Sequence, residues 1–126
     1  MEKSFQATYL QVLSQGIEEI WMDQSFTDVV ITVGSHTYNC HKMVLASLSS
    51  YFSAMFKSGM RESLASSVNL HNIEHKIFEA VLRFVYTGSN VIVQENVEGL
   101  LEAAVMLQIT CLQEQCELFL KKLIGI

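Results

Sequence analysis

The chain has 126 residues with a net charge of −5, and half of its residues are hydrophobic. A chain of this length suits one compact domain, which buries about two thirds of the surface that the unfolded chain exposes. Its eight lysines and arginines are never more than two adjacent, so they do not supply the cluster of phosphate contacts on which nucleic-acid binding depends. The composition therefore excludes nucleic acid as the expected partner, and the high apolar content is a first indication that another subunit covers part of the surface.

The beginning of the chain and its cysteines indicate the cellular setting. The first residues, MEKSFQATYLQ, have no uninterrupted apolar core before a small-residue cleavage site, and no apolar run approaches the length of about 18 residues that a membrane span needs. Three cysteines lack the even, regular spacing of a disulfide framework, so we expect reduced thiols. We therefore expect a soluble protein in the cytoplasm or nucleus that has no membrane partner.

The first predicted element is an amphipathic helix over about residues 5–22, ahead of a single core over about residues 26–123. Its apolar side chains recur at spacings of three and four and form one stripe: Leu10, Leu13, Ile17, Ile20 and Trp21. Glutamines and glutamates lie mostly on the rest of the helix. An apolar stripe this early in the chain must dock on another surface.

A β-hairpin is predicted next. Residues 28–33 have the apolar and β-branched composition of a strand, and residues 37–40 read as the returning strand. Gly34-Ser35 is the two-residue turn between them, because glycine tolerates a positive φ.

From Lys42 the apolar spacing becomes helical, and a second short helix is expected soon after it. Ser49 or Ser50 is its predicted N-cap, and Gly59 is its predicted end. The helix carries an aromatic and methionine face that includes Phe56.

The rest of the chain is predicted to be a short strand followed by helices. Residues 67–70 alternate like a strand, a helix starts near Asn72 and stops at Thr87-Gly88, and residues 91–93 form a last short apolar segment. Two helices follow, over about residues 97–107 and 112–123. With no proline, linker or repeat to divide it, residues 1–126 are expected to form one α+β domain, mostly helical around a small sheet.

The run from Phe26 to Glu62, FTDVVITVGSHTYNCHKMVLASLSSYFSAMFKSGMRE, resembles the start of a BTB (POZ) domain. The matching positions are Asp28, His41-Lys42, Val44-Leu45-Ala46, Ser50-Tyr51-Phe52, Met55-Phe56 and Tyr86-Thr87-Gly88. The order of elements agrees over essentially the whole chain, and the leading helix is similar to the extra N-terminal element of the kelch-like and zinc-finger subfamilies. The resemblance implies the BTB fold and a protein-interaction domain that catalyses no reaction.

The resemblance also implies a homodimer built from the N-terminal helix. Its interface would contain Leu10, Leu13, Ile17, Ile20 and Trp21. The physical argument points the same way, because an apolar stripe that a small domain does not cover commonly meets a symmetry mate. The alternative is that the helix packs on its own domain.

Asp28 and Lys42 are charged residues beside apolar neighbours, where charges are rarely buried unless paired. In dimeric members of the family that the chain resembles, these positions line a charged pocket near the dimer interface. The alternative is that Asp28 only opens its strand and that Lys42 reaches water along its aliphatic stem.

Met60-Arg61-Glu62 is predicted to project from the domain after a Ser-Gly break. It is similar to the hydrophobic-x-Glu motif by which BTB substrate adaptors engage cullin-3, with Met60 as apolar anchor and Glu62 as polar partner. A methionine can repack into a groove, although single exposed apolar side chains are also common. The resemblance implies further cullin contacts at Phe56, at Tyr86 and near residues 107–110.

The sequence gives little support for an enzyme or a cofactor-binding protein. The chain has no G-x-S-x-G elbow and no phosphate-binding glycine loop. Cys40 and His41 do not form a dyad if both are on a strand, since adjacent strand residues face opposite ways. We expect His41 to be structural, at the junction of strand and helix.

A metal site is not expected either. His71 and His75 could share a helix face, yet Cys111 and Cys116 lack a C-x-x-C spacing and no fourth ligand is apparent. We expect both cysteines to pack as small apolar residues.

Two functional classes remain. The first is a substrate adaptor of a cullin-3 ubiquitin ligase, whose substrate binds a domain outside this chain, such as a kelch propeller. The second is a transcriptional regulator whose BTB dimer binds corepressor peptides. Met60-Arg61-Glu62 favours the first, and residues 1–6 are short for the extra strand that zinc-finger members usually add.

Overall fold

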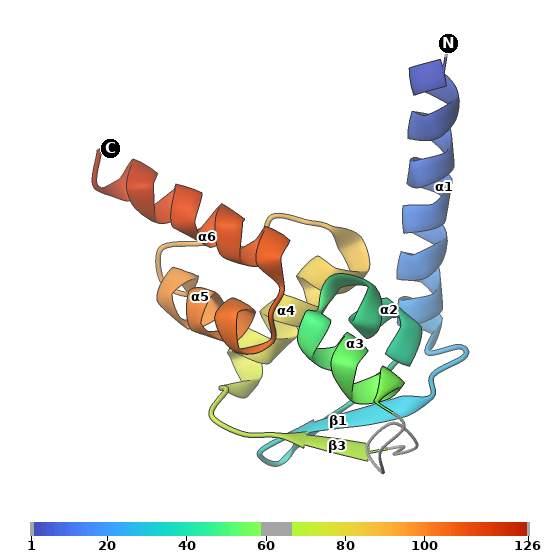
Figure 1. Ribbon diagram of the computed structural model, residues 1–126, viewed down its shortest axis with the longest axis horizontal. Coiled ribbons are helices and arrows are strands. Elements are labelled where there is room, and N and C mark those ends of the chain that lie inside the picture. Colours follow the sequence, from blue (N-terminus) through green and yellow to red (C-terminus); the bar gives the residue numbers. More distant parts are fainter. Residues whose placement is uncertain (1, 59–66, 126) are drawn as a thin grey trace.

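The computed structural model describes residues 2–58 and 67–125 (Figure 1). Their elements, in chain order, are α1 (Glu2–Asp23), β1 (Val29–Val33), β2 (His36–Cys40), α2 (Lys42–Leu48), α3 (Ser50–Lys57), β3 (Ser67–Leu70), α4 (His75–Thr87), α5 (Val97–Met106) and α6 (Thr110–Leu123). The predicted α+β class is confirmed. None of the described helices is long and apolar enough to cross a membrane.

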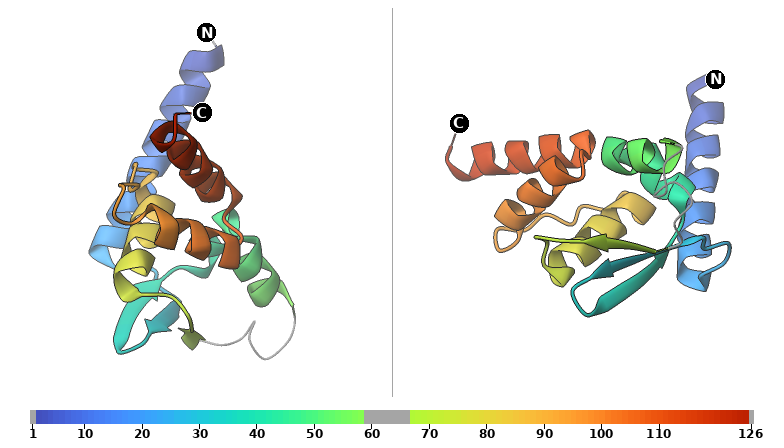
Figure 2. Two further views of the ribbon diagram at one scale, coloured as in Figure 1. Left: turned by 90° about the vertical axis from the view of Figure 1, so that its left-hand side faces the viewer. Right: turned by 60° about the horizontal axis from the view of Figure 1, so that its bottom comes forward.

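The sheet has the strand order β2-β1-β3. β1 and β2 form the predicted antiparallel hairpin, with Val33 opposite His36 at the turn, whereas β1 and β3 are parallel. Gly34 opens the turn with a φ of +61°, as expected for glycine at this position. Alternate residues of β1 are buried, so one face of the sheet meets the helices, which lie on that side in both views of Figure 2.

α4 is the central helix of the core. It packs against α1, α2 and α5, and α5 packs on α6. Its buried side chains follow helical spacing: Phe78, Ala80, Val81, Leu82, Val85 and Tyr86. Gly88 ends it in the left-handed conformation, and the Gly88 N–H donates to the carbonyl of Phe84 at 2.8 Å, as the sequence predicted for a helix stop.

Ser49 fixes the junction of α2, α3 and the C-terminal helices. Its hydroxyl oxygen accepts from the N–H of Phe52 at 3.0 Å, so Ser49, one of the two predicted candidates, is the N-cap of α3. The same hydroxyl donates to the carbonyl of Leu107 at 2.6 Å. The predicted end of this helix, Gly59, lies outside the described residues.

The start of α4 was predicted too early. The helix begins at His75, not near Asn72, because Asn72 adopts a φ of +63°, which is incompatible with a right-handed helix.

Residues 91–93 have no regular structure, and the Asn96 side chain holds them instead. Its Oδ1 accepts from the N–H of Val93, and its Nδ2 donates to the carbonyl of Val91, both at 2.9 Å.

Candidate interaction site

The C-terminal end of α1 is held by four residues, Trp21, Ser25, His41 and Tyr86, which we call the α1 clasp. The Trp21 ring stacks on the Tyr86 ring with centroids 4.8 Å apart and planes within 7°. The Tyr86 hydroxyl accepts from the backbone N–H of His41 at 2.9 Å and lies 2.8 Å from His41 Nδ1. His41 Nε2 lies 2.6 Å from the carbonyl oxygen of Ser25.

Donor and acceptor chemistry fixes the hydrogens in the clasp. A carbonyl oxygen only accepts, so His41 Nε2 carries a hydrogen and donates to Ser25. In the neutral imidazole Nδ1 then carries no hydrogen, so it accepts from the Tyr86 hydroxyl. Burial raises the pKa of Tyr86, so this hydroxyl stays a donor at neutral pH. His41 is therefore structural, as the sequence predicted.

The apolar stripe of α1 has two parts, one that packs on the domain near the clasp and one that is largely exposed. Ile17 and Trp21 are half-buried and pack against the core. Leu10 and Leu13 are 52% and 45% exposed, although they form the wall of a groove of about 350 Å³ between α1 and the end of α4. The helix thus packs on its own domain through its C-terminal half, while its N-terminal half projects from the molecule (Figure 1). The dimer role of the stripe, including half-buried Ile20, stays a prediction.

Asp28 joins the start of β1 to the start of α2. Its Oδ1 accepts from the backbone N–H of Lys42 at 2.8 Å, at a helix N-terminus where His41 supplies no side-chain cap. A carboxylate suits this position, because the first N–H groups of a helix lack intrahelical partners. Lys42 Nζ lies 5.4 Å from the centroid of the Phe56 ring. The charged pocket at a dimer interface stays a prediction for both residues.

The residues predicted to contact cullin-3 fall in three settings. Met60 and Glu62 lie outside the described residues. Phe56 is half-buried and stacks on Phe52 with ring centroids 5.7 Å apart. Tyr86 is only 2% exposed and belongs to the α1 clasp, so in this conformation its side chain is not offered to a partner. Near residues 107–110, Gln108 and Thr110 are exposed.

One prediction about the cysteines was wrong, and the helix face considered for two histidines is not formed. Cys111 is exposed instead of packed, whereas Cys116 is buried as expected. His71 precedes α4 and shares no helix face with His75, whose ring stacks on His36 at 3.8 Å. Within residues 2–58 and 67–125, no three His, Cys, Asp or Glu side chains are grouped to hold a metal ion.

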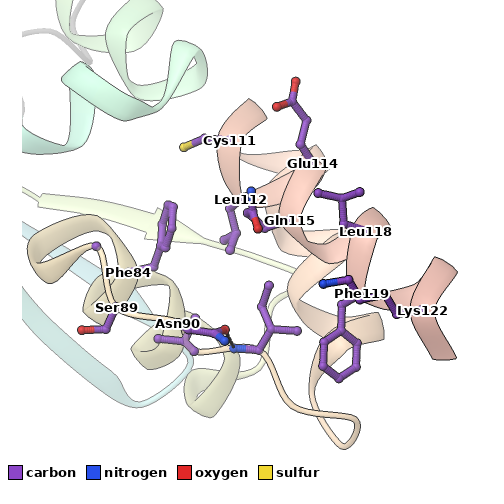
Figure 3. Close-up of a pocket in the computed structure, with 13 residues that line it drawn as sticks. Phe84, Ser89, Asn90, Cys111, Leu112, Glu114, Gln115, Leu118, Phe119 and Lys122 are labelled. Atoms are coloured by element: carbon purple, nitrogen blue, oxygen red, sulfur yellow. Dashed lines mark hydrogen bonds between the residues drawn. The ribbon is translucent and has the colours of Figure 1, made fainter.

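A second groove, of about 500 Å³, lies between residues 88–92 and α6, and we call it the α6 groove (Figure 3). Phe84, Leu112, Leu118 and Phe119 contribute apolar side chains. Glu114, Gln115 and Lys122 contribute polar side chains, and Cys111 also lines it. No sequence motif indicated this groove, because its two sides come from segments separated by α5.

The family model described as BTB/POZ domain matches residues 17–124. This chain belongs to the BTB/POZ domain family. The resemblance found in its signature residues is therefore confirmed. The solved BTB domain of zebrafish PATZ1 shares the fold at a TM-score of 0.81 and 28% identity, covering 92% of this chain and 94% of that one.

The BTB domain is also similar to kelch-like proteins. Kelch repeat and BTB domain-containing protein 2 of Homo sapiens is 36% identical over 98% of this chain and 20% of that protein. Kelch-like protein 25 of Xenopus tropicalis is 44% identical over 77% of this chain and 17% of its own length. Kelch-like protein 23 of Mus musculus is 41% identical over 79% of this chain and 18% of that protein. This BTB domain thus spans about a fifth of the length of these relatives.

Proposed function

We propose that this BTB domain is a homodimeric adaptor module that recruits cullin-3 for a substrate bound through a separate domain. The observation that carries the proposal is Met60-Arg61-Glu62, a hydrophobic-x-Glu sequence shortly after α3 in a chain whose relatives are kelch-like. Exposed apolar residues of α1 support the homodimer. We place this function in the cytoplasm, and it requires neither a cofactor nor an enzymatic step of the domain's own.

The second candidate is a transcriptional regulator whose BTB dimer binds corepressor peptides. The fold alone does not distinguish a cullin-3 adaptor from a transcriptional regulator. The BTB domain of zebrafish PATZ1, whose name is not kelch-like, has the same fold at a TM-score of 0.81. Both classes use the homodimer, so the hydrophobic-x-Glu sequence is what ranks the adaptor first.

Calorimetric titration against the N-terminal region of cullin-3 tests the proposal. A Met60→Ala, Glu62→Ala double variant should lose about 2 kcal/mol or more of binding free energy, roughly thirty-fold in affinity, as expected when interface anchors are truncated. Arg61→Ala is the matched control, since the middle position of the motif is not specified, and it should bind like the wild type. Absence of binding by the folded wild-type domain would overturn the adaptor assignment.

A further inference from the structure

We propose that the outer edge of β2 receives an extended peptide of another protein as an added strand, and that Arg83 binds an aspartate or glutamate side chain of that peptide. The surface lies at the side of the sheet, between β2, α4 and the C-terminal end of α1. The inference goes beyond the proposed function, because it requires neither the homodimer nor cullin-3.

The first observation is the direction of the backbone groups along β2. The strand order β2-β1-β3 places β2 at an edge, with no strand on its other side in the part of the chain that the structure describes. The carbonyl of Cys40 accepts from the N–H of Asp28 at 3.0 Å, so the backbone groups of Cys40 point toward β1. Successive residues of an antiparallel strand alternate in this direction, so those of Thr37 and Asn39 point outward. They are the donors and acceptors that an added strand pairs with.

Gln24 covers this edge only loosely. Its Nε2 donates to the carbonyl of Trp21 at 2.9 Å, but lies 3.5 Å from the carbonyl oxygen of Asn39, which is longer than an ordinary hydrogen bond. The contact shows that the Asn39 carbonyl faces away from β1. Because Gln24 is exposed, the N–H of an incoming strand can take its place at this oxygen.

A groove of about 350 Å³ lies at the same edge. Trp21 and Leu82 give it apolar walls, and Tyr38 lines it from β2. The Tyr38 ring packs edge-on against Phe78, with centroids 5.4 Å apart, so the groove is on the side of the sheet that faces the helices. Side chains alternate along a strand, so every second side chain of an added peptide lies on that side. A groove this small suits the side chains of a single strand and not a folded surface.

Arg83 is the charge that this groove offers to a ligand. Glu79 lies one helical turn before it, but the Glu79 Oε2 accepts from the Tyr38 hydroxyl at 2.7 Å. Burial, together with Glu79, raises the pKa of Tyr38 to about 12, so this hydroxyl keeps its hydrogen at neutral pH. Arg83 is exposed, and its guanidinium makes no hydrogen bond or ion pair with the described residues. Its planar fork of donors matches a carboxylate, whereas a lysine or arginine of the peptide would meet a like charge.

Two synthetic peptides that differ in one residue test the charge assignment. Each has about nine residues, capped ends and alternating threonine and valine, with a central glutamate in one and a glutamine in the other. Nuclear magnetic resonance of the ¹⁵N-labelled domain follows the amide signals of Thr37 and Asn39 during titration. The glutamate peptide should shift both signals and bind about five-fold more tightly than the glutamine peptide. The net charge of −5 opposes this preference, so it must come from a local cation.

Arg83→Gln should remove the preference, so that both peptides bind alike. Lys76→Gln is the matched control, because Lys76 is exposed on the same helix, carries the same charge and does not line the groove. This variant should keep the preference for glutamate.

N-methylation of the glutamate peptide tests strand addition separately, because it removes backbone donors and leaves the side chains unchanged. One peptide is methylated at its odd positions and the other at its even positions. Only the N–H groups on one side of an added strand face β2. One methylated peptide should therefore lose about ten-fold or more in affinity, and the other should bind like the parent.

The alternatives give different results. Equal binding of the two methylated peptides, or no shift of the Thr37 and Asn39 signals at millimolar peptide, overturns strand addition. A glutamate preference that persists in Arg83→Gln overturns the role of Arg83. If the two amides are already protected from hydrogen exchange before peptide is added, another copy of the chain covers the edge and the proposal is wrong. None of these results changes the outcome of the cullin-3 titration, so the two proposals fail independently.

Discussion

Tyr86→Phe is the perturbation that probes the α1 clasp most cleanly. It removes one hydroxyl and keeps the ring that stacks on Trp21. In the wild type that hydroxyl accepts from the backbone N–H of His41 and donates to its Nδ1. Since His41 is buried, the variant leaves one donor and one acceptor without partners among the described residues.

The expected magnitude follows from those two groups. Leaving one buried polar group unsatisfied costs about 1–3 kcal/mol, so leaving two unsatisfied should lower the free energy of unfolding by about 2–6 kcal/mol. This is a large fraction of the roughly 5–15 kcal/mol that stabilises a typical domain. Urea unfolding followed by far-ultraviolet circular dichroism, at one fixed protein concentration because a dimer's stability depends on it, measures the change.

Tyr51→Phe is the matched control. Tyr51 is half-buried, and its hydroxyl makes no hydrogen bond with the described residues, so its loss should change stability by less than about 0.5 kcal/mol. If Tyr86→Phe falls in that same small range, the hydrogen-bond assignment of the clasp is wrong.

Three further predictions concern junctions and pH. Ser49→Ala should cost about 1–3 kcal/mol in urea unfolding, because it removes the α3 cap and leaves the buried Leu107 carbonyl without its donor; an unchanged midpoint would contradict this. Asp28→Ala should remove the α2 cap, lower the free energy of unfolding by about 1 kcal/mol, and therefore lower the urea midpoint; it should also weaken the dimer. A dimer of unchanged stability would remove the predicted role. Burial raises the pKa of the Cys40 thiol from about 9 to about 12. The buried neutral thiol therefore contributes stability that is fully present below about pH 9 and is lost as the pH rises toward 12. In Cys40→Ala, the free energy of unfolding should fall less steeply between pH 8 and 11 than in the wild type.

Local sequence patterns predicted most of the fold. Alternation along β1, the glycine turn at Gly34, the cap at Ser49 and the stop at Gly88 each depend on side chains within a few positions, and each is present in the structure. Asn72 shows where local reasoning failed. Its side chain is compatible with a helix cap, but its left-handed backbone delays α4 by three residues.

The interaction surfaces were less predictable because they join distant segments. The α1 clasp connects residues 21, 25, 41 and 86, and no spacing rule links them. Cys111 had a visible signal, since α6 buries Leu112 and Cys116 four residues apart and Cys111 falls off that face. On α1 the apolar stripe can be seen in the sequence, but only the structure shows that Ile17 and Trp21 dock on the core while Leu10 and Leu13 stay largely exposed.

The most direct measurement is the mass of the complex between this BTB domain and the N-terminal region of cullin-3, by light scattering after size-exclusion chromatography. We predict two copies of the BTB domain with two of cullin-3, because each copy of a two-fold dimer presents the same binding surface. A complex of one copy each, or no complex from a folded dimer, would contradict the account of a dimeric cullin-3 adaptor.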